Sequence, residues 1–401
     1  MVEAMPPRAE ILERARGLIP ALKARAGETE RIRRIPDATI QDLHDTGIWK
    51  IVRPAKYGGW ETDFGVMVEV ATELARGCAS TSWVFTNIIS HNWMLPMWPV
   101  EAHEAVWGEN PNALIGSSLI YPPGRIEETD GGYLLSGRWP YSSGIDASDW
   151  VMLGGMDPAL GDGDAPGGAG KSGPRMFVVR AADLEVFDTW HVSGLAGTGS
   201  KDVACDKLFV PDYMTLAARD TRGGPHQVSA SSDADVYKLP VMGLFAHFLA
   251  CPVLGMAQGA YDDYVETLRE QVSIYSNTRV GDHVTIQIKI AEAGALIDTG
   301  RSIMKESWLE AHRLIAAGET PTVAHKTRWR RDAAYAAQGC VRALDLVYDA
   351  CGGTANYLDN ELQRRFRDIH AAAHQIQIKF EINGPEFSRV ALGLEPLNRN
   401  L

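Results

Sequence analysis

The hydrophobic pattern of this chain changes character twice, and these changes constrain the fold more than any single motif. Apolar residues recur at helical spacing from residue 8 to about 110. Short alternating or apolar runs, separated by Gly, Pro and Asp, fill about 112–225 and are typical of strands. Helical spacing then returns from about 238. The pattern predicts three domains, with boundaries at 1–112 (helical), 113–225 (β) and 226–401 (helical).

The expected arrangement inside these domains follows from segment lengths and turn residues. Four long amphipathic segments predict a C-terminal four-helix bundle, at 248–272, 285–318, 322–353 and 361–382. The central strands predict a β sandwich or a small barrel, with a hairpin turn at DGG, 130–132. The stretch 157–174 is so rich in Gly, Pro and Asp that we expect a loop there, as a lid, a subunit contact or plain disorder.

Charge and cysteine content exclude several classes of function. The formal net charge of −12 argues against nucleic acid or an anionic membrane as the main partner. No run of 18 apolar residues is present, so we expect no membrane span. The five cysteines are scattered without a CxxC pair, which indicates neither a disulfide framework nor a metal site. We expect a cytoplasmic protein that binds no metal.

Four phrases spread along the chain carry a family resemblance. They are LHDTGIWKIVRPAKYGGW near the start, WHVSGLAGTGSKDVACDKLFVP in the β region, YDACGGTANY later, and RRFRDIH opening the last helical segment. With the α–β–α order, they make the chain resemble the acyl-CoA dehydrogenase fold, an α+β architecture, over nearly its whole length. The resemblance implies a homotetramer with flavin held between the β domain and the bundle.

One branch of that fold matches more closely. CASTSWVFTNIISHNW, IGSS, WPYSSG and WHVSGLAGTGS are similar to the oxygenase components of two-component flavin-dependent monooxygenases, such as the steroid-phenol and p-hydroxyphenylacetate hydroxylases. The resemblance implies that a separate NAD(P)H-flavin reductase supplies FMNH2 or FADH2. It also implies that a C4a-hydroperoxyflavin formed with O2 hydroxylates a small aromatic substrate, phenolic or indolic.

Three alternatives to aromatic hydroxylation stay open at this point. They are an FAD-dependent acyl-CoA dehydrogenase, oxygenation of nitrogen or sulfur by the same flavin species, and a non-catalytic protein with this fold. A dehydrogenase needs a carboxylate base, which many members carry eight residues after the RD of the last helix. Ile376 stands at that place, between two glutamines. The missing carboxylate favours an oxygenase, although some dehydrogenases place the base on another helix.

The segments that resemble the oxygenases supply the candidate flavin site. The resemblance implies that a serine of WPYSSG contacts the flavin, with Ser143 the catalytic candidate and alternation along the strand sending only one of Ser142 and Ser143 toward it. The alternative is a strand-end turn whose hydroxyls satisfy the backbone. The remaining candidates for cofactor binding are Ser117, Ser118, Trp139, Ser142, Trp190, Thr198 and Ser200.

Two histidines are candidates for contact with the substrate or with the oxygen that the flavin activates. His91 lies on an apolar helix, where it is either a core residue or a substrate contact. The resemblance implies that a histidine of the last helical segment acts over the flavin, and His374 is the candidate, with Gln375 its rival. His370 and His374 share a helix face, but no third ligand suggests a metal.

A basic run could serve the flavin phosphate. KTRWRRD at 326–332 brings one lysine and three arginines together on a predicted helix. Such a run is usually a solvated helix face. The alternative is that one of these arginines binds the phosphate of flavin, with a neighbouring subunit completing the site.

Overall fold

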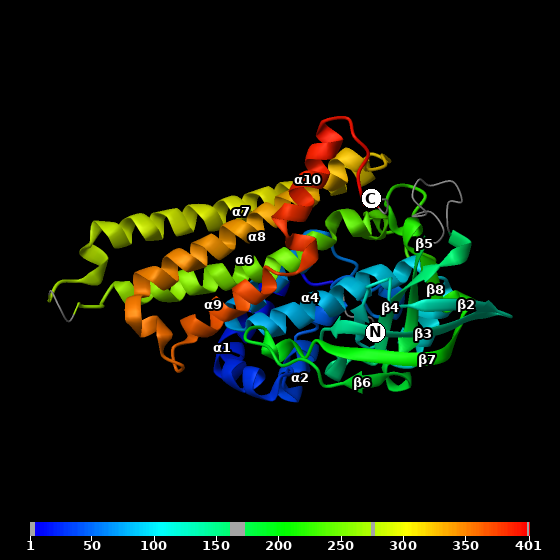
Figure 1. Cartoon of the computed structure of the whole chain (residues 1–401), viewed down its shortest axis with the longest axis horizontal. Coiled ribbons are helices and arrows are strands. Elements are labelled where there is room, and N and C mark those ends of the chain that lie inside the picture. Colours follow the sequence, from blue (N-terminus) through cyan, green and yellow to red (C-terminus); the bar gives the residue numbers. More distant parts are fainter. Residues whose placement is uncertain (1–4, 161–172, 274–276, 399–400) are drawn as a thin grey trace.

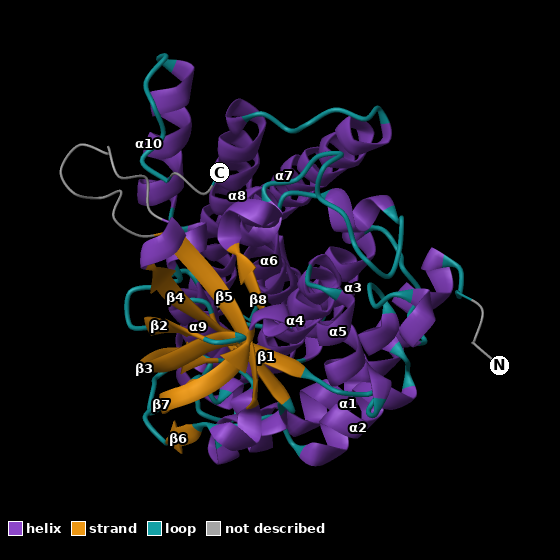
Figure 2. Ribbon diagram, turned by 90° about the vertical axis from the view of Figure 1, so that its right-hand side faces the viewer, coloured by secondary structure: helices purple, strands orange, loops and turns teal. Residues whose placement is uncertain are grey.

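A β region lies at one end of the molecule beside the N-terminal helices, and a long helical bundle extends away from it (Figure 1). The computed structural model describes residues 5–160, 173–273, 277–398 and 401. Figure 2 shows the strands gathered on one side of the molecule, with helices packed beside and behind them. The predicted order of helical, β and helical regions is confirmed.

The N-terminal region is built around one fully buried helix. In α4 every residue except Asn87 is buried, which is the environment that its apolar sequence requires. Asp63 caps the preceding helix, because its side chain accepts a hydrogen bond from the backbone N–H of Val66. The helices of this region are α1 (Arg8–Ile32), α2 (Asp37–Asp45), α3 (Phe64–Gly77), α4 (Ala79–Met94) and α5 (Val100–His103).

The central region forms two four-stranded sheets rather than a closed barrel. One sheet has the order β1–β4–β5–β8 and the other β2–β3–β7–β6, with only the β1–β4 pair parallel. The predicted hairpin is confirmed, because Thr129 pairs with Gly132 and Gly131 has a φ of +73°. The strands are β1 (Ile115–Ser118), β2 (Arg125–Thr129), β3 (Gly132–Ser142), β4 (Trp150–Asp157), β5 (Gly173–Arg180), β6 (Glu185–Phe187), β7 (Lys201–Pro211) and β8 (Thr215–Ala217).

Connections without long helices or strands flank the β region. The first strand begins at Ile115, and the connection from β8 to the bundle runs from residue 218 to 240. Of the loop predicted at 157–174, the ends belong to β4 and β5, and residues 161–172 lie outside the described residues.

The C-terminal bundle differs from prediction in its last helix. The pattern predicts one helix over 361–382, but α9 ends at Ala372 and α10 begins only at Phe380. The side chains of His374 and Gln375 bond to nearby backbone, at His370 O and Gln377 N, and so stabilise a turn between them. The helices are α6 (Val241–Leu268), α7 (Val284–Ala316), α8 (Val323–Cys351), α9 (Glu361–Ala372) and α10 (Phe380–Ala391).

Helix α6 is the most apolar element of the bundle. Among the described helices it alone is long and apolar enough to cross a membrane, and 83% of its most apolar stretch is buried in the protein. Burial by the neighbouring helices accounts for this composition without a membrane.

Candidate active site

The serine turn at the end of β3 has an irregular backbone. The pairing of β3 with β7 shifts between Trp139 and Ser142, and Tyr141 adopts a left-handed φ of +64°. A bulge of this kind redirects side chains and breaks the alternation expected along a strand. The hydroxyl of Ser142 is buried and has no hydrogen-bond partner within the described chain. The bulge therefore separates the roles of the two adjacent serines.

Ser143 belongs to a short chain of hydroxyl groups. Its Oγ lies 2.7 Å from the Oγ of Ser200, which lies 2.6 Å from the Oγ1 of Thr198. Thr198 in turn donates to the carbonyl of Leu195 at 2.8 Å. The backbone N–H of Gly144 also donates to the carbonyl of Thr198, at 2.9 Å. The serine turn and the glycine-rich loop at 194–200 thus form one hydrogen-bonded unit.

An aromatic pair stands beside this unit. Trp190 is half-buried, and its ring meets that of Tyr141 edge to face at 6.1 Å. The indole N–H of Trp190 donates to the carbonyl of Leu195 at 3.0 Å. Tyr141 is 62% exposed, so part of this aromatic surface is open to a ligand.

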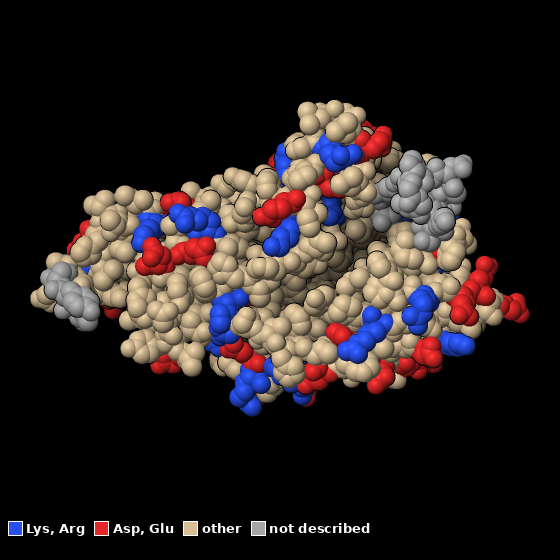
Figure 3. Space-filling model, in the orientation of Figure 1, with Lys and Arg blue, Asp and Glu red and all other residues tan. Residues whose placement is uncertain are grey.

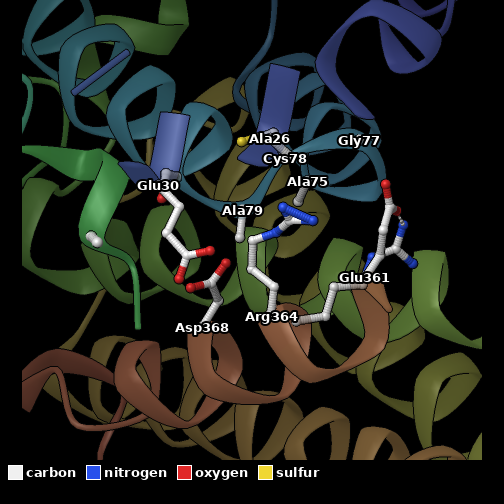
Figure 4. Close-up of a pocket in the computed structure, with 12 residues that line it drawn as sticks. Ala26, Glu30, Ala75, Gly77, Cys78, Ala79, Glu361, Arg364 and Asp368 are labelled. Carbon is white, nitrogen blue, oxygen red and sulfur yellow. Dashed lines mark ion pairs between the residues drawn. The ribbon is translucent and has the colours of Figure 1, made fainter. Parts of the chain in front are cut away.

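A buried carboxylate attaches the loop to the bundle. Asp368 on α9 accepts a hydrogen bond from the backbone N–H of Leu195 at 2.6 Å. Burial raises the pKa of Asp368 to about 6, and the bond from Leu195 opposes that shift. Figure 4 shows its carboxylate facing that of Glu30 across a small cavity between α1, α9 and the start of α4. The cavity holds about 20 Å³, which is room for one water molecule.

His91 presents an unpaired nitrogen inside the protein. The residue is fully buried, and its Nδ1 lies 2.8 Å from the carbonyl of Ile115. Because that carbonyl only accepts, Nδ1 carries the proton and Nε2 is left as an acceptor. No described group bonds to Nε2. Burial lowers the pKa of His91 to about 4, so the ring is neutral near neutral pH.

The remaining β-domain candidates divide into two groups. Ser117 and Ser118 are buried at the end of β1, and Ser118 donates to the carbonyl of Pro140 at 2.6 Å. Trp139 is fully buried and donates from its indole N–H to the carbonyl of Gly154 in the other sheet, at 2.7 Å. This position joins the two sheets and favours a packing role for Trp139 rather than the predicted contact with flavin.

The candidates of the last helical segment lie just beyond α9. His374 is exposed, and its Nδ1 donates to the carbonyl of His370 at 2.8 Å, which leaves Nε2 as an acceptor. His370 pairs instead with Asp345 at 2.9 Å. The side chain of Gln375 caps the following turn. His374 thus leaves its Nε2 without a partner in the described chain, and His370 leaves its Nδ1.

The basic run on α8 is mostly engaged in contacts within the chain. Arg328 pairs with Glu310, and Arg331 pairs with Asp332. Arg330 is buried and donates to the carbonyl of Met242 at 2.9 Å. Lys326 has no hydrogen bond or ion pair within the described chain. The prediction that one of the arginines binds a flavin phosphate stays a prediction.

Sequence reasoning missed the role of Asp368. The segment RRFRDIH, which contains Asp368, contributes to the family resemblance. The hydrogen-bond partner of Asp368, Leu195, lies 173 positions earlier in the sequence. For His91 and Ser142, residue type is the only signal in the sequence. The geometry adds that His91 Nε2 and Ser142 Oγ are buried without a partner in the described chain.

These residues fit a flavin ring. Neutral donors and acceptors of the serine turn, a partly open aromatic pair and close-approaching glycines suit a planar heterocycle that carries both kinds of polar atom. Figure 3 shows the surface hollowed between the part that carries α10 and the β domain, and this hollow is largely uncharged in that view. The turn between α9 and α10 borders the same region (Figure 1).

Comparison with known proteins first shows the class of fold to which the chain belongs. Models of the acyl-CoA dehydrogenase N-terminal domain and C-terminal domain match residues 9–103 and 247–379. Together with the α–β–α architecture, these matches define a flavoprotein fold of the acyl-CoA dehydrogenase type.

Individual relatives then define the family. The HsaA oxygenase subunit of a flavin-dependent monooxygenase from Rhodococcus jostii is 33% identical over 90% of this chain and 92% of the relative. The oxygenase component of an FADH2-dependent resorcinol hydroxylase from a Rhizobium species is also 33% identical, over 97% and 96%. The chain belongs to the oxygenase components of two-component flavin-dependent monooxygenases.

Solved structures agree with this assignment. The HsaA monooxygenase from Mycobacterium tuberculosis has a TM-score of 0.89 and 31% identity, covering 98% of this chain and 100% of that one. XiaF from a Streptomyces species, solved with FADH2 and glycerol, has a TM-score of 0.88 and 28% identity, covering 98% of each chain. The predicted monooxygenase is confirmed, with reduced flavin as cofactor and O2 as co-substrate.

Proposed function

We propose that this enzyme hydroxylates a phenolic ring, and that His91 and Ser142 are the residues that face the reaction. The observation that carries the proposal is the pair of buried polar atoms without partners in the described chain, His91 Nε2 and Ser142 Oγ. Sixteen buried side-chain polar atoms lack a partner within the described residues, and these two belong to the segments CASTSWVFTNIISHNW and WPYSSG, which resemble the oxygenase components. The names of the relatives support a phenol, since one of them hydroxylates resorcinol.

The neutral state of His91 suits a phenol. Its Nε2 accepts a hydrogen bond from the substrate hydroxyl, which moves electron density toward the ring and favours attack at the adjacent carbon. Because burial keeps the imidazole uncharged, this acceptor is available at neutral pH. Reduced flavin, when bound, supplies the activated oxygen atom, and this chain supplies the orientation and the exclusion of water.

The two serines have different parts in this proposal. Ser142 contacts the flavin through its unpartnered hydroxyl, whereas Ser143 holds the turn through Ser200 and Thr198. This division changes the sequence-based preference for Ser143. Trp190 would pack against the flavin ring, and His374, whose Nε2 has no partner in the described chain, would hold a proton there.

The assembly and the flavin type complete the proposal. We propose a homotetramer in the cytoplasm, supplied by a separate NAD(P)H-dependent flavin reductase. Relatives named for FADH2, or solved with it, favour FADH2 over FMNH2 for this chain as well.

The test mixes the protein anaerobically with FADH2 or FMNH2, then adds O2. We expect a transient near-ultraviolet absorbance distinct from oxidised flavin, and a hydroxylated product when a phenol such as resorcinol is present. No transient with either flavin, or reduction of bound flavin by an acyl-CoA, would contradict the proposal. A transient with transfer of oxygen only to nitrogen or sulfur compounds would replace the phenol with a heteroatom substrate.

A matched pair of variants tests the serine assignment. Ser142→Ala should shorten the lifetime of the transient and lower product yield, with the unfolding temperature unchanged, because its hydroxyl bonds to nothing in the described chain. Ser143→Ala should lower stability by about 1 kcal/mol, since it removes one hydrogen bond. The reverse pattern would restore Ser143 as the flavin contact.

A further inference from the structure

Leu195 has a backbone conformation that is unusual for a residue other than glycine. Its φ of +55° and ψ of +29° place it in the left-handed region, directly before the 3-10 turn Ala196–Thr198. This conformation brings the Cβ atom close to the following carbonyl oxygen, at a cost in free energy that glycine avoids. The residue is only 4% exposed, so little of it is open to water. Contacts within the protein therefore hold Leu195 in this conformation.

Both backbone polar groups of Leu195 form hydrogen bonds. Its N–H donates to the carboxylate of Asp368 at 2.6 Å. Its carbonyl accepts from the indole N–H of Trp190 at 3.0 Å and from the hydroxyl of Thr198 at 2.8 Å. A rotation of this backbone would move both sets of partners together. Leu195 therefore connects a carboxylate on α9 to the indole and to the chain of hydroxyl groups that ends at Ser143.

Arg367 provides a second attachment of the loop to α9. Its guanidinium donates to the carbonyl of Ser193 at 2.6 Å and pairs with Glu30 on α1. A Cβ atom at Gly194 would lie only 2.2 Å from the carbonyl oxygen of Arg367, so a glycine is needed where the loop approaches the helix. Arg367 and Asp368 thus fix two neighbouring parts of the loop to the same turn of α9.

The other side of the loop lies against the N-terminal helices. A Cβ atom at Gly197 would lie 2.9 Å from the carbonyl oxygen of Thr29 on α1 and 3.0 Å from the Cβ of Ser80 on α4. The carboxylate of Asp368 faces Glu30 across a cavity between these helices and α9 (Figure 4). That cavity has room for one water molecule, about 20 Å³, so the loop has little space to shift while Asp368 is present.

We propose that Asp368 and Arg367 are positioning residues for the flavin reaction. They hold Leu195 in its left-handed conformation and so orient the indole of Trp190 and the hydroxyl of Thr198 at the flavin site. This inference rests on the proposed function, because it assigns residues that act behind the same site. Their effect passes through the backbone of Leu195, and neither side chain touches the flavin. When the loop relaxes, reduced flavin and O2 give oxidised flavin and hydrogen peroxide, and less oxygen reaches the substrate.

The test measures the lifetime of the near-ultraviolet transient, and the product and hydrogen peroxide formed per flavin oxidised, in the full-length protein with FADH2 and O2. Asp368→Ala should shorten the lifetime about fivefold or more and replace product by hydrogen peroxide. Asp368→Asn keeps an acceptor for the N–H of Leu195 and should stay close to the parent. Arg367→Met loses the bond to Ser193 and should change the lifetime in the same direction as Asp368→Ala.

A pair of double variants tests whether the backbone of Leu195 carries the effect. Leu195→Gly, added to Asp368→Ala, should restore most of the lifetime, because glycine adopts a φ of +55° without the cost of a Cβ atom. Leu195→Ala in the same background is the matched control, since it also removes the buried side chain but keeps Cβ. Its lifetime should stay short. If Asp368 acted through packing alone, the two double variants would have equal lifetimes.

Asp157 on β4 provides a control for the loss of a buried carboxylate. It accepts from the backbone N–H of Ala159 at 2.9 Å and from Arg175 at 2.6 Å. Asp157→Ala should lower the unfolding temperature and leave the lifetime of the transient unchanged. If Asp368→Ala does not fold, Arg367→Met takes its place in every comparison.

Two results would overturn this inference alone. They are a lifetime in Asp368→Ala and Arg367→Met equal to that of the parent, and a restored lifetime with Leu195→Gly no longer than with Leu195→Ala. The absence of any transient in the parent protein, with either reduced flavin, would instead overturn the proposed function and this inference with it.

Discussion

Replacing Asp368 by asparagine should stabilise the protein, although the residue holds the glycine-rich loop to the bundle. Its pKa rises from an ordinary 3.8 to about 6, chiefly because it is buried. A rise of that size corresponds to about 3 kcal/mol against the charged form at neutral pH. The asparagine side chain would be neutral, and its amide oxygen would still accept from the N–H of Leu195. We expect Asp368→Asn to gain about 2–3 kcal/mol at about pH 7.5.

The change of stability with pH follows from the direction in which folding shifts the pKa of Asp368. The folded-state pKa lies above the unfolded one, so the folded protein holds more protons between pH 3.8 and about 6. The contribution of Asp368 to stability therefore falls as pH rises through that window. The advantage of Asp368→Asn should drop to about half at pH 5, where the native aspartate is mostly protonated.

The assay is thermal unfolding at about pH 7.5 and pH 5, with Asp368→Ala as the control. For a chain of 401 residues, 2–3 kcal/mol corresponds to about 3 °C in Tm. Asp368→Ala leaves the Leu195 N–H without an acceptor, at a cost of about 1–3 kcal/mol, so its Tm should lie below that of the asparagine variant. Only Asp368→Ala should weaken binding of reduced flavin. A lower Tm for Asp368→Asn than for the parent at the higher pH would refute the reasoning.

Other variants test the site from different directions. Trp139→Phe should lower the free energy of unfolding by about 1 kcal/mol and leave the flavin Kd unchanged, and a weaker flavin Kd would show that the indole contacts flavin. His374→Ala should lower product yield per flavin oxidised and cost about 1 kcal/mol of stability, since the exposed ring makes one hydrogen bond, to the carbonyl of His370; an unchanged yield would remove it from the site. His91→Gln should reduce the loss of stability on acidification from about pH 6.5 to about pH 4.5. In the folded protein the pKa of His91 is about 4, which is below that of the unfolded ring, so proton uptake by the unfolded ring favours unfolding as the pH falls. An unchanged acid profile in His91→Gln would contradict the assignment.

The overall architecture could be predicted because it depends on the local periodicity of apolar residues along the sequence. Helical spacing, strand alternation and the Asp130–Gly131 turn each depend on neighbours in the sequence, and all three appear in the structure. The break after α9 could not be predicted in this way. Neither Gly nor Pro marks it, and the turn depends on side-chain bonds from His374 and Gln375.

The contacts of the candidate site residues could not be predicted from alternation along the strand. Alternation implies that one of two adjacent serines faces inward, but the bulge at Tyr141, with its φ of +64°, invalidates simple alternation. The contact of Asp368 is with a segment distant in sequence, the loop at Leu195. Such contacts exist only once the chain is folded.

The distribution of charge explains how this fold suits oxygen insertion better than proton abstraction. A dehydrogenase needs an ionised carboxylate over the substrate, and Ile376 stands where many members carry it. The groups that we propose to face a ligand, His91 Nε2 and Ser142 Oγ, are neutral hydrogen-bonding atoms. The buried carboxylate of Asp368 is bonded to the backbone N–H of Leu195. Neutral groups of this kind suit the proposed contact with a phenolic hydroxyl better than the removal of a proton from carbon, which needs an ionised base.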